Sequence, residues 1–283
     1  MERDDKEKIV SRDLHFPSAV RSVLSLTNRD LKKWYKSPIV LAMSLITPVV
    51  WLVLFGKAFN IGSLFSGAAG NQVLLSVFGT TSYFSFLAVG MLSFMALTAS
   101  MQSGMSMVWD RRFGFTNKLL STPVKRSAII IGKVLNSVIR ALVQSAVVLI
   151  IAIVLGMTTG FITVSNLLVT FSALFLLSFG ISALFLMLAL KATDWQSQMM
   201  IINLLMMPLF FTSNAFFPIS EMPSWLQVVA NFNPMSYAID ISRGALLGVT
   251  TATNIGLDFV YLGGFAVVFG VVCIVLAWKL LKG

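Results

Sequence analysis

The stretch Val108–Arg126, VWDRRFGFTNKLLSTPVKR, decides the fold, because it is a charged segment between two apolar runs. Each run is long enough to cross a bilayer, since a transmembrane helix needs about 20 predominantly apolar residues. The segment holds five Lys or Arg residues and one acid, Asp110. Loops that remain on the cytoplasmic side of a membrane carry such an excess of basic residues. We therefore expect this segment to face the cytoplasm.

The composition of the 283 residues is that of a membrane protein. Hydrophobic residues make up 57% of the chain and charged residues 11%, and the mean hydropathy is +0.87, whereas a soluble domain is about one quarter charged. The net charge of +10 would suit a nucleic-acid binder, but such proteins gather basic residues on a soluble face. Here the basic residues lie in short segments beside apolar runs. We expect membrane lipids, and no nucleic acid, among the partners.

Six apolar runs predict an all-α polytopic membrane protein with six transmembrane helices. The runs are Ile39–Phe59, Tyr83–Val108, Ala128–Leu155, Leu167–Leu190, Met199–Phe217 and Phe259–Trp278. Nine Lys and Arg residues precede the first run, five lie in the segment after the second, and two follow the last. The other side has Arg243, and also Lys57 if its side chain extends outward. This asymmetry predicts that both termini are cytoplasmic, in the cell (cytoplasmic) membrane.

The chain before the first run divides into two parts. Residues 1–15 are nearly all polar and predict a solvated cytoplasmic tail. Residues 16–37 predict an amphipathic helix with a basic polar face, which we expect to lie in the membrane interface. A helix packed in a soluble domain is the alternative, but the chain offers no other soluble domain. The apolar residues that recur at spacings of three and four are Val20, Leu24, Thr27, Leu31 and Trp34.

The six-span domain, 38–283, contains two unusual parts. In the third run, Lys133, Asn136 and Arg140 share one face of the cytoplasmic end, so we expect this helix to project below the hydrocarbon as a stiff arm. The outer segment, 218–258, holds many apolar residues and one Lys or Arg, which is not the composition of a solvated loop.

The outer segment predicts a re-entrant helix pair that closes the outer side. Pro223–Val229 predicts a short helix, and a second helix is expected from the Asn-Pro pair at 233–234 to Leu247, ending at Gly248. Such helices enter a membrane only if protein or water satisfies their backbone ends. The residues that define this segment are Pro223, Trp225, Asn233, Pro234, Asp240 and Arg243, of which the last two, three residues apart, can pair.

The chain lacks residues that other classes of membrane protein need. Its eleven acids and its one histidine, His15, lie outside the centres of the apolar runs, whereas proton-coupled carriers keep such a group inside the membrane. No G-x-x-x-x-G-K-[ST] motif for ATP is present, and one cysteine, Cys273, is too few for a cysteine metal site. We expect a permease with no catalytic, cofactor or metal residues of its own, driven by a separate motor subunit.

Two long motifs carry a resemblance to a known family. WDRRFGFTNKLLSTPVKRSAIIIGKV, Trp109–Val134, resembles the cytoplasmic loop of the type-2 ATP-binding cassette (ABC) transporter permeases. FFPISEMPSWLQVVANFNPMSYAIDISRGALLG, Phe216–Gly248, resembles the outer segment of the same family. The chain departs from the family where Arg112 replaces a frequent Glu and where Asn117-Lys118 replaces a more acidic pair. The likeness covers nearly the whole chain, which is similar to drug-resistance-type export permeases.

The resemblance implies a partner and a function. Trp109–Leu120 would form a coupling helix on a soluble ABC ATPase subunit, which would hold ATP and Mg, and the N-terminal helix would also touch it. A second copy or a homologue would complete the transporter, which would export a drug-like, lipid or glycan-linked compound. The ATPase-coupling residues in loop 109–126 are Trp109, Asp110, Arg111, Arg112, Phe113, Gly114, Lys118, Pro123 and Arg126. The alternatives are basic residues that only set topology, and a non-transporting membrane scaffold or assembly factor.

The fifth run predicts part of a substrate path. Asn203, Met206, Phe210 and Asn214 recur at spacings of three and four and would form one face with amide and soft apolar character. In the family that this chain resembles, such a path lies between two copies, lined by the second and fifth spans. The alternative is that these side chains only pack against neighbouring helices.

Overall fold

The structure is a computed structural model, which describes residues 19–54, 56, 68–115, 121, 126–158, 160–192, 194–249 and 254–280. The predicted tail 1–15 and the coupling residues Lys118 and Pro123 lie outside them. The helices are α2 (Ala19–Tyr35), α3 (Pro38–Val53), α5 (Ala68–Phe78), α6 (Tyr83–Arg112), α8 (Arg126–Val154), α9 (Val164–Lys191), α10 (Trp195–Phe211), α11 (Ser224–Phe232), α12 (Pro234–Leu247) and α13 (Ile255–Leu280), with a 3-10 helix, η2 (Ile219–Glu221). The predicted all-α polytopic membrane fold is confirmed.

The helices long and apolar enough to cross a membrane are fewer than the six predicted. In the described part of the chain they are Gln72–Arg112, Ser127–Val154, Val164–Lys191 and Ile255–Leu280. The pair α2 and α3, bent by 78°, would supply a fifth. Helix α10 has 17 residues and is therefore about 25 Å long, slightly less than the hydrocarbon thickness of about 30 Å. The multi-pass character is established, and the count of six stays a prediction.

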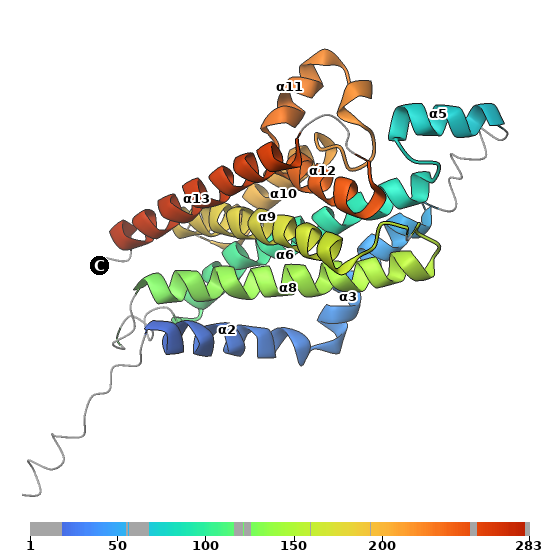
Figure 1. Cartoon of the computed structure of the whole chain (residues 1–283). Coiled ribbons are helices and arrows are strands. Elements are labelled where there is room, and N and C mark those ends of the chain that lie inside the picture. The colour runs from blue at the N-terminus through green and yellow to red at the C-terminus, as the bar shows by residue number, and fades with distance from the viewer. Residues whose placement is uncertain are drawn as a thin grey trace, which may run out of the picture.

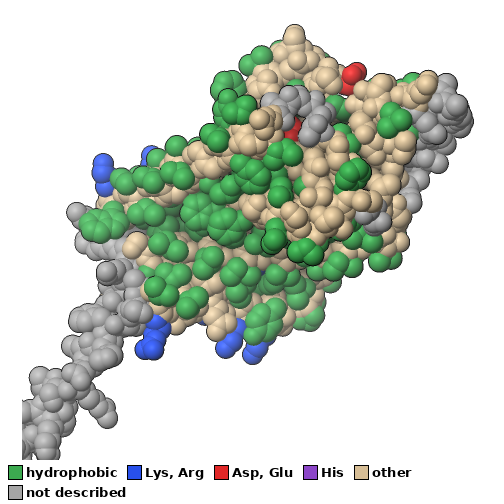
Figure 2. Space-filling view, viewed as in Figure 1, with side chains coloured by type: hydrophobic (Ala, Val, Ile, Leu, Met, Phe, Trp, Pro, Cys, Tyr) green, Lys and Arg blue, Asp and Glu red, His purple; other side chains and the backbone are tan. Residues whose placement is uncertain are grey.

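The bundle is built around α6, which packs against both α8 and α9, and these two helices also contact each other (Figure 1). Helix α13 covers α9, and α2 lies along α8. The end of the bundle with α2, the start of α8 and the end of α13 is called here the basic end, and the end with α5, α11 and α12 the capped end. Lys and Arg side chains gather toward the basic end on the face in Figure 2, as the sequence asymmetry predicts.

Small residues and hydroxyls let α6 approach its neighbours closely. Ser100 and Ser103 of α6 donate from Oγ to the carbonyl oxygens of Ser178 and Ser182 on α9, at 3.2 and 2.8 Å. A Cβ at Gly104 would lie 2.6 Å from the carbonyl oxygen of Phe185, so α9 approaches this position more closely than a side chain permits. Helices in lipid associate through such small residues and interhelical hydrogen bonds, because apolar surface gains nothing by leaving lipid.

The second helix of the outer segment begins and ends where the sequence predicts. Asn233 is the N-cap of α12, and its side chain accepts a hydrogen bond from the Met235 N–H at 2.9 Å. Pro234 occupies the first turn, and Gly248 ends the helix with a φ of 69°, a left-handed conformation that favours glycine. The Asn233 amide also donates to the Leu209 carbonyl at 2.7 Å. One asparagine therefore caps α12 and ties the outer segment to α10.

Arg243 fixes α12 to the rest of the bundle. It is fully buried, and its Nη2 donates to the carbonyl oxygens of Phe86 on α6, at 3.2 Å, and Ala215 after α10, at 3.0 Å. The guanidinium carbon lies 3.3 Å from the centroid of the Phe86 ring. The Asp240 carboxylate, the predicted partner of Arg243, accepts a hydrogen bond from the Asn214 amide at 2.6 Å. Backbone carbonyls and a ring therefore hold this buried cation.

Several helix limits differ from the predictions. Helix α6 continues to Arg112, beyond the predicted Val108. Helix α10 starts at Trp195 and ends at Phe211, six residues before the predicted Phe217, where the Thr212 N–H closes its last turn on the Pro208 and Phe210 carbonyls. Helix α11 extends from Ser224 to Phe232, beyond the predicted Val229. Helix α5 was not predicted, because its 11 residues are too few for a span.

Replacing Arg243 with Met should destabilise the protein while keeping a long apolar side chain. The change leaves two buried carbonyl oxygens without their donor, so we expect the free energy of unfolding to fall by about 2–4 kcal/mol. The thermal midpoint of the purified protein in detergent measures this loss. Arg112→Met, at an exposed position, is the control. Equal midpoints for Arg243→Met and the unsubstituted protein would contradict the assignment.

Candidate functional site

The predicted coupling loop begins as the last turn of α6. The Phe113 N–H bonds to the Trp109 carbonyl at 3.1 Å and the Gly114 N–H to the Arg111 carbonyl at 3.0 Å. Gly114 then turns the chain with a φ of 67°, a left-handed conformation that favours glycine. A separate coupling helix starting at Trp109 is therefore wrong for its first four residues, because the α6 hydrogen-bond ladder runs through them. Residues 116–120 lie outside the described part of the chain.

The carboxylate of Asp110 joins three helices. Its Oδ2 lies 2.7 Å from Nζ of Lys133 on α8 and 3.1 Å from Nη2 of Arg29 on α2. Arg29 also pairs with Asp30, at 2.6 Å, and Lys133 donates to Oγ of Ser106, at 3.2 Å. Lys133 is only 3% exposed, and a charge that is buried so deeply needs both a counter-charge and hydrogen bonds. We call Arg29, Asp30, Asp110 and Lys133 the Asp110 cluster.

Arg111 points to the end of α9. Its Nη1 donates to the carbonyl oxygens of Ala189, at 3.2 Å, and Leu190, at 3.0 Å. These carbonyls belong to the last turn of α9, where backbone acceptors lack helical partners and the helix dipole favours a cation. Asp110 and Arg111 therefore hold the basic end together within the chain.

Aromatic residues are exposed beside these internal contacts. The side chain of Phe113 is 71% exposed and that of Trp109 37% exposed, and their rings stack with centroids 5.3 Å apart. Trp109 also makes an edge contact with Trp195, the first residue of α10, at 4.6 Å. We call the side chains of Trp109, Phe113 and Trp195, together with the exposed Arg112, the docking patch. Arg126 begins α8, but its side chain is not described.

Helix α2 runs beside the first turns of α8, in the same direction. Thr27 donates to the Gly132 carbonyl at 3.2 Å, and Trp34 lies under the Arg140 guanidinium at 5.2 Å. The predicted apolar face does not pack as a unit, because Val20 and Leu24 are 67% and 57% exposed. The Asp110 cluster requires the polar residues of α2 to face inward, which turns part of the apolar face outward.

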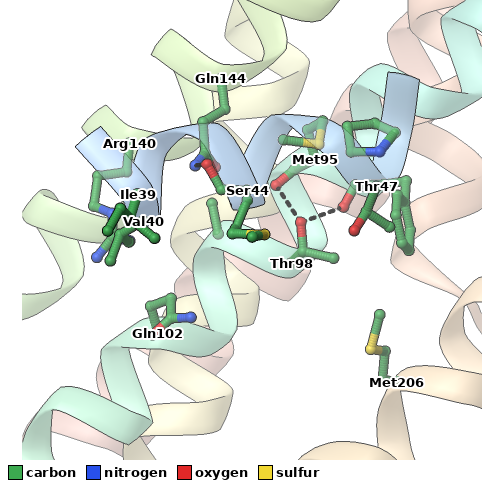
Figure 3. Close-up of a pocket in the computed structure, with 14 residues that line it drawn as sticks. Ile39, Val40, Ser44, Thr47, Met95, Thr98, Gln102, Arg140, Gln144 and Met206 are labelled. Carbon is green, nitrogen blue, oxygen red and sulfur yellow. Dashed lines mark hydrogen bonds between the residues drawn. The ribbon is translucent and has the colours of Figure 1, made fainter. Parts of the chain in front are cut away.

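A groove follows α6 from the basic end toward mid-bundle. One cavity of about 480 Å³ lies between α3, α6, α8 and α10 (Figure 3), and another of about 440 Å³ continues to the docking patch. Both are lined by Val40, Gln102 and Arg140, so the two cavities adjoin at these residues, and we call them together the lateral groove. Pockets of 300–1,000 Å³ are typical of small-molecule sites.

The lining of the lateral groove is mixed: apolar side chains are in the majority in the part that Figure 3 shows, whereas Asp30, Lys33, Asp110 and Asn136 help to line the part beside the docking patch. Gln144 donates to Ser44 at 2.8 Å, and the Thr98 hydroxyl donates to backbone carbonyls of its own helix. The Arg140 Nε is buried and has no hydrogen-bond partner among the described residues. Arg140 therefore brings a positive charge and a donor to the wall of the groove, at the point where its two parts meet (Figure 3).

The predicted substrate face on the fifth run is not one face. Met206 lines the lateral groove, and Asn203 is exposed. Phe210 is 4% exposed and packs against Trp51 and Phe94. Asn214 follows the end of α10 and contacts the outer segment. The helical spacing holds for Asn203, Met206 and Phe210, which lie on α10 at different depths of burial, and it fails for Asn214 because α10 ends at Phe211.

Sequence reasoning missed three groove residues. Gln102 and Gln144 lie inside apolar runs, and Arg140 was assigned to a projecting arm instead of a groove wall. Polar side chains within a membrane helix usually face the protein interior or a cavity. That rule, applied to the two glutamines, would have pointed to the groove.

Comparison with known protein families matches residues 21–247, most of the chain, to the family described as ABC-2 type transporter. The chain belongs to that family. The resemblance seen in the two sequence motifs is thereby confirmed, and the protein is a permease subunit of an ABC transporter, the membrane subunit without an ATPase site of its own. The family also implies an ABC ATPase partner and often a dimeric arrangement.

Individual relatives agree with this membership. The permease is 31% identical to "Putative transport permease ycf38" of Pyropia yezoensis over 80% of this chain and 74% of that protein. It is 25% identical to "Daunorubicin resistance ABC transporter permease protein DrrB1" of Streptomyces coeruleorubidus, over 89% and 84%. It is 24% identical to "Nodulation protein J" of Rhizobium leguminosarum bv. viciae, over 87% and 91%.

The Asp110 cluster predicts strong coupling between Asp110 and Lys133 of this permease. Asp110→Asn and Lys133→Met should each destabilise the protein, because the first leaves the buried Lys133 without its nearest counter-charge and the second leaves Asp110 with Arg29 alone. The double variant should lose less than the sum of the two, with a coupling free energy of about 1–3 kcal/mol. Thermal midpoints of all four proteins measure it, with the exposed Lys32→Met as control. Additive losses would show that the pair does not interact.

Proposed function

We propose that the permease exports a hydrophobic or amphipathic compound, drug-like, lipid or glycan-linked, across the cytoplasmic membrane, powered by ATP hydrolysis in a separate soluble ATPase subunit. The observation that carries this proposal is the continuity between the docking patch and the lateral groove. Trp109 and Phe113 line the part of the groove that begins at the basic end, and Arg140 and Gln102 lie in both parts. An ATPase bound to the patch therefore acts directly on the groove wall.

The docking patch has the character of a protein-binding site. Exposed aromatic side chains with an adjacent Arg are the residue types that dominate interface energies. In this proposal ATP and Mg bind the ATPase alone, and this chain carries no cofactor. The excess of Lys and Arg at the basic end supports a cytoplasmic position for the patch and for both termini.

Helix α6 suits the transmission of force from the patch. Its 30 residues give a rod of about 45 Å. At the basic end Asp110 links the rod to α8 and α2, and Arg111 links it to α9. The contact between Trp109 and Trp195 brings the first turn of α10 into the same patch. Displacement of the patch would therefore shift α10, one wall of the groove, relative to α3, the other.

The lining of the lateral groove supports an amphipathic compound. Ile39, Met43 and Met206 offer apolar contact, while Gln102 and Arg140 offer hydrogen bonds and a charge. The groove is open on one side, so a second copy or a homologue would close it into a full pathway. The relative named for daunorubicin resistance fits a compound of this class.

Phe113→Ala should weaken binding of the ATPase about tenfold or more, because truncation of an aromatic interface anchor costs about 2 kcal/mol of binding free energy. Trp109→Ala should act in the same direction. Co-purification and titration of the ATPase against permease in nanodiscs measure the affinity. Phe232→Ala, at an 84% exposed position on α11 of the capped end, is the matched control. Full ATPase affinity of Phe113→Ala, with correct membrane insertion, would refute the docking patch.

The groove is tested by photocrosslinking from single positions in the reconstituted complex. A photoreactive side chain at Met206 or Gln102 should label the transported compound, whereas one at Val267, 64% exposed on α13, should not. Labelling of protein neighbours alone would exclude the lateral groove as the path. A membrane scaffold, the alternative function, would bind the ATPase and yet move no compound when ATP is supplied to vesicles.

A further inference from the structure

A second cavity, of about 510 Å³, lies at the capped end and shares no lining residue with the lateral groove. The turn after α10, η2, α11, α12 and α13 all contribute to its wall, and polar residues dominate it. We call it the outer pocket. Neither the docking patch nor the proposed path uses it, so its composition requires a separate explanation.

Two buried polar atoms in the outer pocket lack partners. Asn214 is 1% exposed, and its Nδ2 donates to the Asp240 carboxylate at 2.6 Å. A carboxylate only accepts, so this bond fixes the amide with Oδ1 as the remaining acceptor. Oδ1 has no hydrogen-bond partner in the described part of the chain, and neither has Oγ of Ser236, which is 2% exposed. Buried polar atoms are normally paired, so both are positioned for a donor from outside the chain.

The outer pocket has a negative electrostatic character. Asp240 lines it, and burial raises the pKa of Tyr237, another lining residue, with the nearby buried Asp258 and Asp240 raising it further. Among the described residues the cation near Asp240 is Arg243, which attracts the Asp240 carboxylate but is not part of the lining. Its Nη2 is directed to carbonyls of α6 and of the turn after α10. A ligand in this pocket meets carboxylate and amide acceptors before it meets the guanidinium.

Two tyrosines provide an aromatic wall. The rings of Tyr237 and Tyr261 stack with centroids 5.1 Å apart and an interplanar angle of 18°. The Tyr237 hydroxyl donates to the Asn231 carbonyl, which fixes the ring. The faces of such rings attract a cation and also accept an apolar carbon skeleton.

We propose that the outer pocket is a binding site for an organic molecule that carries a protonated amine. The ammonium group donates its N–H bonds to Asn214 Oδ1, Ser236 Oγ and the Asp240 carboxylate, and the carbon skeleton packs on the two tyrosines. Acceptors, negative charge and aromatic rings together select this class over anions, which the carboxylates repel, and over plain hydrocarbons, which leave the buried acceptors unpaired. The site stands independently of the direction of transport and of the ATPase.

Cysteine labelling of the full-length permease in nanodiscs tests this proposal. In a Cys273→Ala background, Ser220→Cys places a thiol at an exposed position in the wall of the outer pocket. Ser224→Cys, exposed at the start of α11 and outside the lining, is the matched control. The probes are 2-aminoethyl and 2-hydroxyethyl methanethiosulfonate, which differ in the ammonium group. We expect the ratio of cationic to neutral labelling rates to be about tenfold higher at 220 than at 224.

Two further measurements link the effect to the proposed residues. Asp240→Asn, which keeps the size of the side chain, should bring the ratio at 220 down to the control value. Unlabelled 2-phenylethylammonium should protect Ser220→Cys from the neutral reagent, and 2-phenylethanol should not. Equal ratios at 220 and 224, or equal protection by amine and alcohol, would overturn the proposal. If Asp240→Asn fails to fold, Ser236→Ala replaces it, and undiminished protection by the amine in that variant would remove Ser236 from the site and contradict the proposal.

Discussion

The Asp110 carboxylate is the contact on which the arrangement of the basic end depends. It lies between Lys133 and Arg29, and so it fixes three helices from separate parts of the chain at one depth. Each of these charges alone would be costly to bury, and only the joint arrangement makes the position tolerable. This contact sets the position of α2, and it also sets the position of the wall of the lateral groove at the basic end. The polar cluster thereby determines which aromatic side chains of α6 are left on the surface.

Local patterns in the sequence predict the elements of this fold well, and they predict contacts between elements poorly. Apolar runs located α6, α8, α9 and α13 to within a few residues, because hydrocarbon thickness sets a minimum length. The caps at Asn233 and Gly248 located α12, because capping depends on neighbouring residues. By contrast, Arg29 and Asp110 are 81 positions apart in the sequence, and no hydrophobic periodicity predicts an ion pair between residues so far apart. The end of α10 was missed because an apolar sequence continues beyond it.

Buried polar groups in this permease belong to two groups with different consequences. Arg243 bonds through Nη2 to two carbonyl oxygens and lies over a ring, which holds α12 in place, although its buried Nε and Nη1 have no hydrogen-bond partner among the described residues. Asn214 and Ser236 line the outer pocket, and each has one buried oxygen without a hydrogen-bond partner among the described residues. The first kind of group adds stability to the outer segment. The second leaves part of a hydrogen-bonding requirement to be met by something else.

The hydrogen bonds from serine hydroxyls between α6 and α9 also determine which substitutions the sequence can accept during evolution. Ser100 and Ser103 bond to carbonyl oxygens of the opposite backbone, and every residue type supplies such an oxygen. A replacement at 178 by another small residue therefore keeps the acceptor, whereas a replacement at 100 or 103 loses a donor, and so does one at 182, whose hydroxyl donates to the Ser100 carbonyl oxygen at 3.4 Å. Selection on this contact should consequently bear more heavily on the three positions that donate than on position 178.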